Sequence, residues 1–280
     1  MKILSKLQSL KKAVETIADQ STLALGGNVL HRAPMAFVRE LARQEKSGLK
    51  LVKTAGAHDI DLLCAAGSVA TVDAGFVSYE TVYGLPPHYR KAVQTGMVKA
   101  NEHACYTVIS ALRGASANVP FMPVSGLKYG DLIEHNDYFV VVEDPFTGEP
   151  VTLVRSIFPD VAVIHVQQCD EEGNAIIAGP KFEDVLMSRA ADRVIITTEQ
   201  IVSPFQIKQN KDKIDIPAFL VDAVVHVPGG AAPTSCYQKY DVDEQPLRKF
   251  LGLKEKQEVA EFIKNYERKD YQQERGTRVW

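Results

Sequence analysis

Thr22-Leu-Ala-Leu25-Gly26-Gly27-Asn28, with Pro34 opening a helical pattern through Leu41, is the stretch that decides the fold. The short apolar run predicts a strand, and the two glycines end it. Proline suits the first turn of a helix, because its missing N–H has no partner there. Strand, glycine turn and helix together predict a βα unit.

The same unit recurs along the chain. Residues 49–54 predict a strand that Gly56 ends, and residues 59–66 predict the helix after it. Residues 161–166 and 193–198 are apolar without alternation, as in strands buried on both faces. Residues 138–142 and 151–155 flank a hairpin signal. The sequence therefore predicts an α/β fold with an open, mostly parallel sheet flanked by helices and one antiparallel hairpin excursion.

The two ends of the chain have helical patterns. Leu4, Leu7, Leu10, Val14 and Ile17 share one face of an expected N-terminal helix. Four more segments predict helices: 87–95, 102–117, 182–191 and 254–266. Residues 218–227 predict the last strand. We expect one domain over residues 1–280, with 267–280 as a loose tail.

Composition limits the class of protein. The chain has 280 residues, 45% of them apolar and 24% charged, with a net charge of −3. This charge provides no basic field for nucleic acid or an anionic membrane, and no window reaches the ~18 apolar residues of a membrane span. The four cysteines form no C-x-x-C pair, so we predict reduced thiols, no metal site and a cytoplasmic location.

Two glycine-rich turns are candidate ligand sites. Gly26-Gly27-Asn28 follows a strand, so its backbone N–H groups could cradle an oxyanion, or the glycines could serve a tight βα turn. The loop from Gly229 to Ser235 could line a pocket or simply leave the sheet.

The remaining polar residues give no catalytic constellation. His165 lies inside an apolar strand and is best interpreted as a core histidine, whereas His31 beside the glycine turn is a better pocket candidate. Glu102, expected at a helix start, could be catalytic or could complement the helix dipole. Ser78 lacks the Gly-x-Ser-x-Gly elbow of hydrolases.

Read in order along residues 1–250, several short motifs resemble the A (alpha) subunit of the two-subunit family I CoA-transferases, most closely the glutaconate CoA-transferase branch. The motifs are Leu25-Gly-Gly-Asn28, Ala33-Pro34, Val38-Arg-Glu-Leu41, Asp61-Leu-Leu, Gly67-Ser-Val69, Tyr79-Glu80, Pro87-His-Tyr-Arg-Lys-Ala92, Val119-Pro-Phe-Met-Pro123, Val163-Ile-His-Val166, Asp170-Glu-Glu-Gly-Asn174, Thr198-Glu199 and Val225-His-Val-Pro-Gly-Gly230 with Ala231-Ala-Pro-Thr-Ser235.

The resemblance implies a mechanism. Coenzyme A is a substrate, no cofactor is permanently bound, and a glutamate on a partner B subunit carries the CoA as a thioester between an acyl-CoA and a small carboxylic acid. The resemblance implies that Gly26, Gly27 and Asn28 stabilise the oxyanion from the A side. Ser78 and Glu80 are expected at the acyl group or pantetheine arm. The two subunits would form a heterodimer, heterotetramer or larger assembly.

Three alternatives stay open. A related branch in steroid-ring degradation is a CoA-thioester hydrolase that uses a glutamate on the corresponding chain, and Glu102 lies near the matching place. The chain could instead be a non-catalytic subunit that binds acyl-CoA, or, more remotely, a sugar-phosphate isomerase on the same sheet. The A-subunit interpretation predicts an exposed apolar face at the carboxyl end of the sheet.

Overall fold

The centre of the molecule is a seven-stranded parallel sheet in the order β12-β11-β8-β1-β2-β3-β4. The computed structural model describes residues 5–125, 127, 131–209 and 211–275. The central strands are β1 (Thr22–Leu25), β2 (Leu49–Gly56), β3 (Val69–Val77), β4 (Lys99–Glu102), β8 (Val161–Val166), β11 (Arg193–Thr198) and β12 (Ala223–His226). The prediction of an open, mostly parallel α/β sheet is confirmed.

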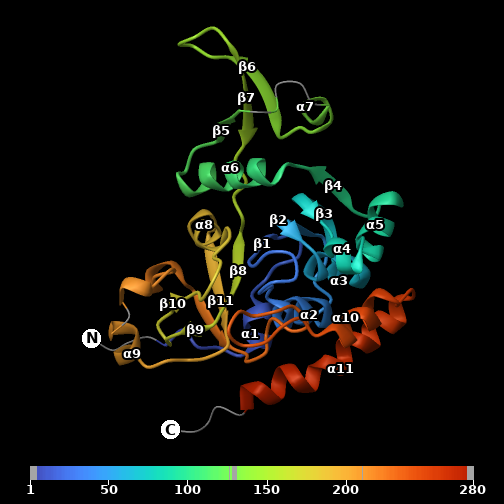
Figure 1. Cartoon of the computed structure of the whole chain (residues 1–280), viewed down its shortest axis with the longest axis vertical. Coiled ribbons are helices and arrows are strands. Elements are labelled where there is room, and N and C mark those ends of the chain that lie inside the picture. Colours follow the sequence, from blue (N-terminus) through green and yellow to red (C-terminus); the bar gives the residue numbers. More distant parts are fainter. Residues whose placement is uncertain (1–4, 126, 128–130, 210, 276–280) are drawn as a thin grey trace.

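Helices cover both faces of this sheet (Figure 1). One face carries α1 (Leu10–Glu15), α2 (Met35–Arg43), α3 (His58–Ala66) and α11 (Lys256–Arg275), and the other carries α6 (Cys105–Ser116) and α8 (Asp184–Ala190). Successive strand residues point to opposite faces. Leu23 and Leu25 therefore join the core under α2, whereas Ala24 joins the core under α6.

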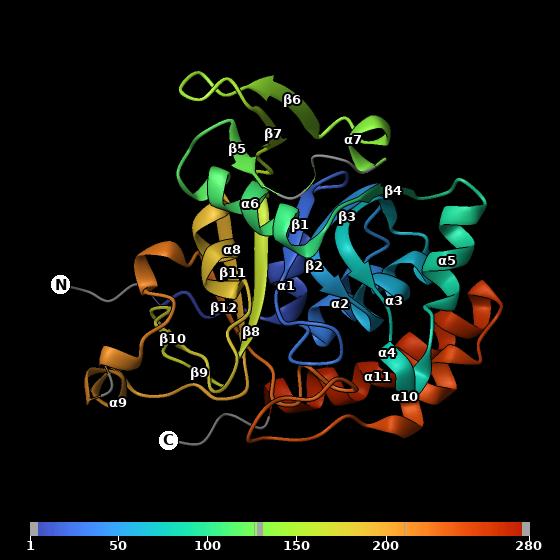
Figure 2. The same cartoon turned by 45° about the horizontal axis from the view of Figure 1, so that its top comes forward.

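The antiparallel excursion is a separate three-stranded sheet beyond the amino ends of the central strands (Figure 2). Its order is β5 (Phe121–Val124), β7 (Pro150–Arg155) and β6 (Phe139–Glu143). The expected hairpin is confirmed as β6 and β7. In this sheet β5 is an edge strand that pairs with β7, a position where Pro123 is tolerated because its missing N–H can face outward.

The remaining described elements are short. They are α4 (Glu80–Tyr83), α5 (Pro87–Gln94), α7 (Leu132–His135), β9 (Gln168–Cys169), β10 (Ala175–Ile176), α9 (Pro204–Gln209), the 3-10 helices η1 (Lys211–Lys213) and η2 (Ala218–Leu220), and α10 (Glu244–Leu251). Within the residues described, no helix has the length and apolar content to cross a membrane.

Near the N-terminus the structure corrects the predicted helix. The helix occupies only Leu10–Glu15, because the preceding residues pair with the last strand: Gln8 donates its backbone N–H to Val224, and Val224 donates to Lys6. Leu7 lies in this bridge and is 43% exposed, and Leu4 lies outside the described residues.

Three further boundaries differ from the prediction. Glu102 ends β4, and the helix expected from 102 begins only at Cys105. The run expected as a strand from 218 starts as η2, so its strand begins at Ala223. Residues 267–275, expected to be a loose tail, continue α11, and 276–280 lie outside the described residues.

Candidate active site at the carboxyl edge of the sheet

Three turns meet where β1, β2 and β3 end. The backbone N–H of Val29 donates to the carbonyl of Ala55 at 2.9 Å, and that of Ser78 donates to Gly56 at 3.0 Å. Val29, Ala57 and Tyr79 also share one small apolar cluster. The structure thus brings the Gly26–Asn28 turn and the Ser78–Glu80 turn to the same edge, where open α/β sheets usually bind ligands.

Close packing explains both glycines after β1. A Cβ at Gly26 would lie 2.9 Å from the Oδ1 of Asp184, and one at Gly27 would lie 2.4 Å from the carbonyl oxygen of His31. Gly27 also has a φ of +73°, which side chains of L-residues rarely adopt. Any larger residue would push the turn away from the strand beneath it.

The amides of this turn are all used inside the fold. Gly26 donates to the carbonyl of Val163, Gly27 to Asp184 and Asn28 to His31, each at 2.8 to 2.9 Å. The expectation that these N–H groups stabilise an oxyanion stays a prediction, and in this structure each of them has a partner within the chain. The side-chain amide of Asn28 is half-buried, and no hydrogen bond joins it to any residue that the structure describes. Asn28 can therefore still offer its side-chain N–H to a ligand.

Two buried charges clamp the peptide group between Gly26 and Gly27. The ammonium of Lys53 donates to the carbonyl of Gly26 at 2.8 Å, and the carboxylate of Asp184 accepts the N–H of Gly27 at 2.8 Å. Each charge has a counter-charge: Lys53 lies 2.5 Å from Asp59, and Asp184 pairs with Arg32. All four side chains are at most 1% exposed. Charge-assisted bonds on both sides hold this peptide in one orientation.

Arg32 ties this clamp to the neighbouring strand. Its guanidinium donates to the carbonyl of His165 at 2.7 Å and to that of Pro180 at 3.0 Å, besides pairing with Asp184. Sequence reasoning missed Arg32, Lys53, Asp59 and Asp184. Arg32 and Asp184 are 152 residues apart, and nothing in the local pattern of either one indicates the other.

The second turn is closed by its own backbone. The N–H of Tyr79 donates to the carbonyl of Gly84, and the N–H of Gly84 donates to Glu80, both at 2.9 Å. Ser78 accepts the N–H of Glu80 at 3.0 Å. Glu80 has a φ of +60°, a left-handed conformation that is uncommon for a non-glycine residue and frequent at functional sites. The exposed carboxylate of Glu80 is thereby presented at the edge of the sheet.

Tyr79 anchors this turn in the core. Its side chain is fully buried, and its hydroxyl donates to Asp61 at 3.0 Å. Asp61 also accepts the backbone N–H groups of His88 and Tyr89, which are the orphan donors at the start of α5. Burial raises the pKa of Asp61 to about 7, although the bonds from Tyr89, Tyr79 and His88 oppose that shift.

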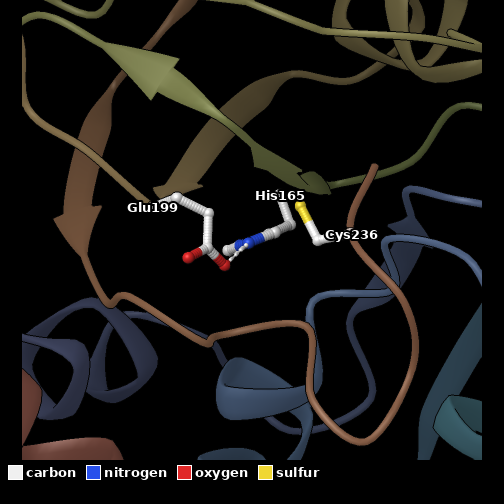
Figure 3. A group of neighbouring side chains, drawn as sticks. All are labelled: His165, Glu199 and Cys236. Carbon is white, nitrogen blue, oxygen red and sulfur yellow. Dashed lines mark hydrogen bonds and ion pairs between the residues drawn. The ribbon is translucent and has the colours of Figure 1, made fainter. Parts of the chain in front are cut away.

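A buried network surrounds His165 (Figure 3). Its Nε2 lies 2.8 Å from Glu199 and its Nδ1 lies 2.9 Å from Thr197. Glu199 further accepts bonds from Tyr240 at 2.6 Å and from the N–H of Gly229 at 2.8 Å. Burial disfavours the ionised form of Glu199, but these bonds outweigh it and lower the pKa of the carboxyl. The interpretation of His165 as a core histidine agrees with this geometry, in which it braces the 229–235 loop.

The same network does not fit a metal ion, although His165, Glu199 and Cys236 offer ligand atoms within 4.8 Å of one another. Both ring nitrogens of His165 and both oxygens of Glu199 already have protein partners. Burial and the charge of Glu199 raise the pKa of the Cys236 thiol to about 12, so the thiolate that a metal needs is disfavoured.

The other predicted residues lie around this edge. His31 bonds Ser235 through Nδ1 at 2.8 Å, and burial lowers the pKa of its ring. Its Nε2 is buried and has no hydrogen-bond partner in the described part of the chain. Glu102 is exposed at the end of β4, the edge strand next to β3, and its backbone carbonyl accepts the side-chain N–H of Asn136 at 2.5 Å.

An apolar rim borders the Ser78–Glu80 turn, as expected for this end of the sheet. Phe76, Val82 and Leu85 are 42%, 64% and 62% exposed. Phe76 and Leu85 also line a shallow cavity of about 520 Å³ that includes Ser78 and Glu80. Exposed apolar side chains around polar groups are typical of a binding surface.

Comparison with known proteins places these observations in one family. Residues 7–227 match the family model described as Coenzyme A transferase. The chain is 31% identical to the A subunit of glutaconate CoA-transferase from Acidaminococcus fermentans, over 91% of its own length and 85% of that protein. The crystal structure of that enzyme superposes with a TM-score of 0.89 at 30% identity, covering 94% of this chain and 88% of the other.

Two other relatives are similar over most of this chain. The chain is 30% identical to the cholesterol ring-cleaving hydrolase IpdA subunit of Rhodococcus jostii, over 92% of this chain and 90% of that protein. It is 36% identical to an uncharacterized protein of Archaeoglobus fulgidus over 93% of its length, but it spans only 59% of that protein.

Replacement of Lys53 by Met tests the charge clamp. The change leaves Asp59 buried without its counter-charge, so we expect the free energy of unfolding to fall by about 3–5 kcal/mol in urea denaturation. Lys50→Met, an exposed lysine on the same strand, is the matched control and should stay within about 0.5 kcal/mol of wild type. Equal effects of the two changes would contradict the clamp.

Asp61 should make stability depend on pH. Its pKa is raised from 3.8 to about 7, so the folded state holds a proton that the unfolded chain has lost over that interval. The free energy of unfolding of wild type relative to Asp61→Asn should therefore fall by up to about 1.4 kcal/mol per unit as pH rises from 4 to 7. Parallel stability profiles of the two proteins across this range would contradict the assignment.

Proposed function

This chain belongs to the coenzyme A transferase family, and we propose that it is the A (alpha) subunit of a heteromeric CoA-transferase. In this proposal the enzyme moves CoA between an acyl-CoA and a small mono- or dicarboxylic acid. Coenzyme A is a substrate, and no resident cofactor or metal takes part. The partner is a B (beta) subunit that supplies the nucleophilic glutamate.

One observation carries the proposal: the buried acids at this edge already have protein partners. Asp59 accepts Lys53, Asp184 accepts Gly27 and Arg32, and Asp61 accepts three donors. The buried acids therefore hold the turns of this edge in place, and in this proposal the attacking group arrives from another chain.

The reaction divides into balanced steps. The partner's glutamate attacks the thioester carbonyl, the C–S bond breaks, and CoA thiolate leaves an acyl–glutamyl anhydride. The thiolate then attacks the glutamyl carbonyl and releases the first carboxylate, leaving the glutamyl–CoA thioester. The acceptor acid takes up the CoA by the reverse of these steps.

We assign this chain the task of stabilising the negative oxygen that forms at each attack. The side-chain amide of Asn28 is a donor without a protein partner among the described residues, and two buried charges fix the peptide group that precedes it, between Gly26 and Gly27. A donor that is already oriented costs no reorganisation when the charge forms. Ser78 and Glu80 stay our candidates for the acyl group or pantetheine arm, and the apolar rim is our candidate contact with the partner.

A second function is favoured by one relative. The chain is 30% identical, over 92% of its length, to a protein named as a cholesterol ring-cleaving hydrolase, and the notable acid in that alternative is Glu102. Its carboxylate is exposed at the end of β4, with no hydrogen bond to the described part of the chain. In a CoA-thioester hydrolase this group would act as a base or nucleophile.

Asn28→Ala tests the proposed oxyanion donor. Loss of one such donor should lower kcat for CoA transfer by the complex about 10²–10³-fold, while thermal stability stays within error. The matched control is Asn265→Ala, an exposed asparagine on α11. Unchanged kcat in Asn28→Ala, measured with the partner present, would remove Asn28 from the mechanism.

Glu102→Gln separates the two functions. A transferase whose nucleophile lies on the partner should keep kcat within about threefold, whereas a hydrolase that uses Glu102 should lose about 10²-fold or more. Glu261→Gln, an exposed change on α11, controls for general effects of losing a charge. A large loss confined to Glu102→Gln would favour the hydrolase.

A further inference from the structure

A polar cavity of about 460 Å³ lies at the other end of the sheet from the candidate active site. Its walls come from the amino-terminal halves of β1 to β4, from the residues just before β6, and from the end of β7 with the residues after it. The thirteen lining residues are Thr22, Lys50, Thr71, Asp73, Lys99, Asn101, Asn136, Asp137, Tyr138, Arg155, Ser156, Ile157 and Phe158. The mechanism proposed above uses none of them.

Strand register creates this cavity. Thr22 pairs with Lys50, Lys50 with Thr71, and Thr71 with Lys99, so four neighbouring strands place polar side chains in one row. A row that a helix covers in a parallel sheet is normally apolar. Here α6 begins over the carboxyl half of the sheet, where the Cys105 thiol contacts the carbonyl of Thr54 on β2. The polar row at the amino ends of the strands is therefore not covered by the start of this helix.

Three cations from three elements face this space. Lys50 on β2 and Lys99 on β4 are exposed, and neither makes a hydrogen bond or ion pair with the described residues. Arg155 on β7 is held over the ring of Tyr138 at 4.3 Å, which fixes its guanidinium at the wall. Converging cations in a concave, polar surface concentrate the field that attracts an anion.

Two acids, Asp73 and Asp137, also line the cavity, and Asp73 is buried at its floor. Asp73 is 3% exposed, and its Oδ1 lies 3.0 Å from the side-chain nitrogen of Asn101 and 3.3 Å from Nε2 of His103. His103 is itself buried between the rings of Tyr138 and Phe139. A buried carboxylate beside three cations favours a ligand that bears hydroxyl groups as well as negative charge.

We propose that this cavity binds a small phosphorylated molecule that also carries hydroxyl groups. The phosphate pairs with Lys50, Lys99 and Arg155, since ammonium and guanidinium groups bind phosphate oxygens strongly. Asp73 and Asn101 face the hydroxyls. The volume lies within the roughly 300–1,000 Å³ of small-molecule sites and exceeds what a lone phosphate fills. The ligand is either a free phosphorylated metabolite or the nucleotide end of a CoA molecule.

Titration calorimetry on the full chain tests this site with ribose 5-phosphate, ribose, inorganic phosphate and CoA as probes. We expect ribose 5-phosphate to bind more tightly than ribose or phosphate. Lys99→Gln and Arg155→Gln should each weaken that binding about tenfold or more. Lys249→Gln, an exposed lysine on α10, should leave it unchanged. None of these residues is part of the proposed catalytic machinery, so binding at this site can fail while the proposed function stands.

The probes also identify the source of the phosphate. Binding of ribose 5-phosphate that depends on Lys99 and Arg155 assigns the cavity to a free metabolite. Binding of CoA alone, with the same dependence, assigns it to the nucleotide end of CoA. No binding of any probe, or equal weakening by Lys249→Gln, would overturn the proposal. Because Lys99 and Arg155 are exposed, both variants should fold, and circular dichroism will check this.

Discussion

The peptide group between Gly26 and Gly27 is held by two buried charges of opposite sign, and the candidate active site depends on this constraint. Lys53 fixes its carbonyl and Asp184 fixes its N–H. Isolated buried charges are costly, so each needs its counter-charge in Asp59 or Arg32. The four side chains come from β2, α3, α8 and the β1–α2 connection. The clamp therefore joins four parts of the fold around a single turn.

The polar side chains near this edge of the sheet are of two kinds: those whose hydrogen bonds stabilise the fold, and those that are available to bind a ligand or partner. Asp59, Asp61, Asp184 and Glu199 serve the fold, because each accepts bonds from buried donors. Asn28, Glu80 and Glu102 still offer side-chain groups to a ligand or partner. A site with oriented donors and no buried acid left to attack agrees with the division of labour that we propose for a two-chain enzyme.

Local sequence patterns predicted the layers of the fold but not the buried ion pairs that hold the Gly26–Gly27 peptide group. Apolar runs and the glycines after β1 indicated the parallel sheet, since burial on both faces leaves a strong sequence signal. Glu102 was predicted to start a helix because its segment continues a helical pattern. In the structure it belongs to β4, which pairs with β3 as an edge strand. The partners of the amides at 26–28 could not be predicted, because Val163 and Asp184, which accept two of these N–H groups, lie far beyond any local window. The burial of Lys53 could not be predicted, because lysine side chains are almost never fully buried unless they are paired with an opposite charge.

In the proposed enzyme, this chain supports a covalent step that is carried out on another chain. Intact-protein mass spectrometry tests it directly, on a mixture of this chain with its candidate B subunit that has been exposed to a panel of acyl-CoAs. We expect a CoA-sized adduct on the partner and none on this chain, since the proposed nucleophile is the partner's glutamate. A CoA or acyl adduct on this chain would contradict the account, because the nucleophile would then lie on the A side.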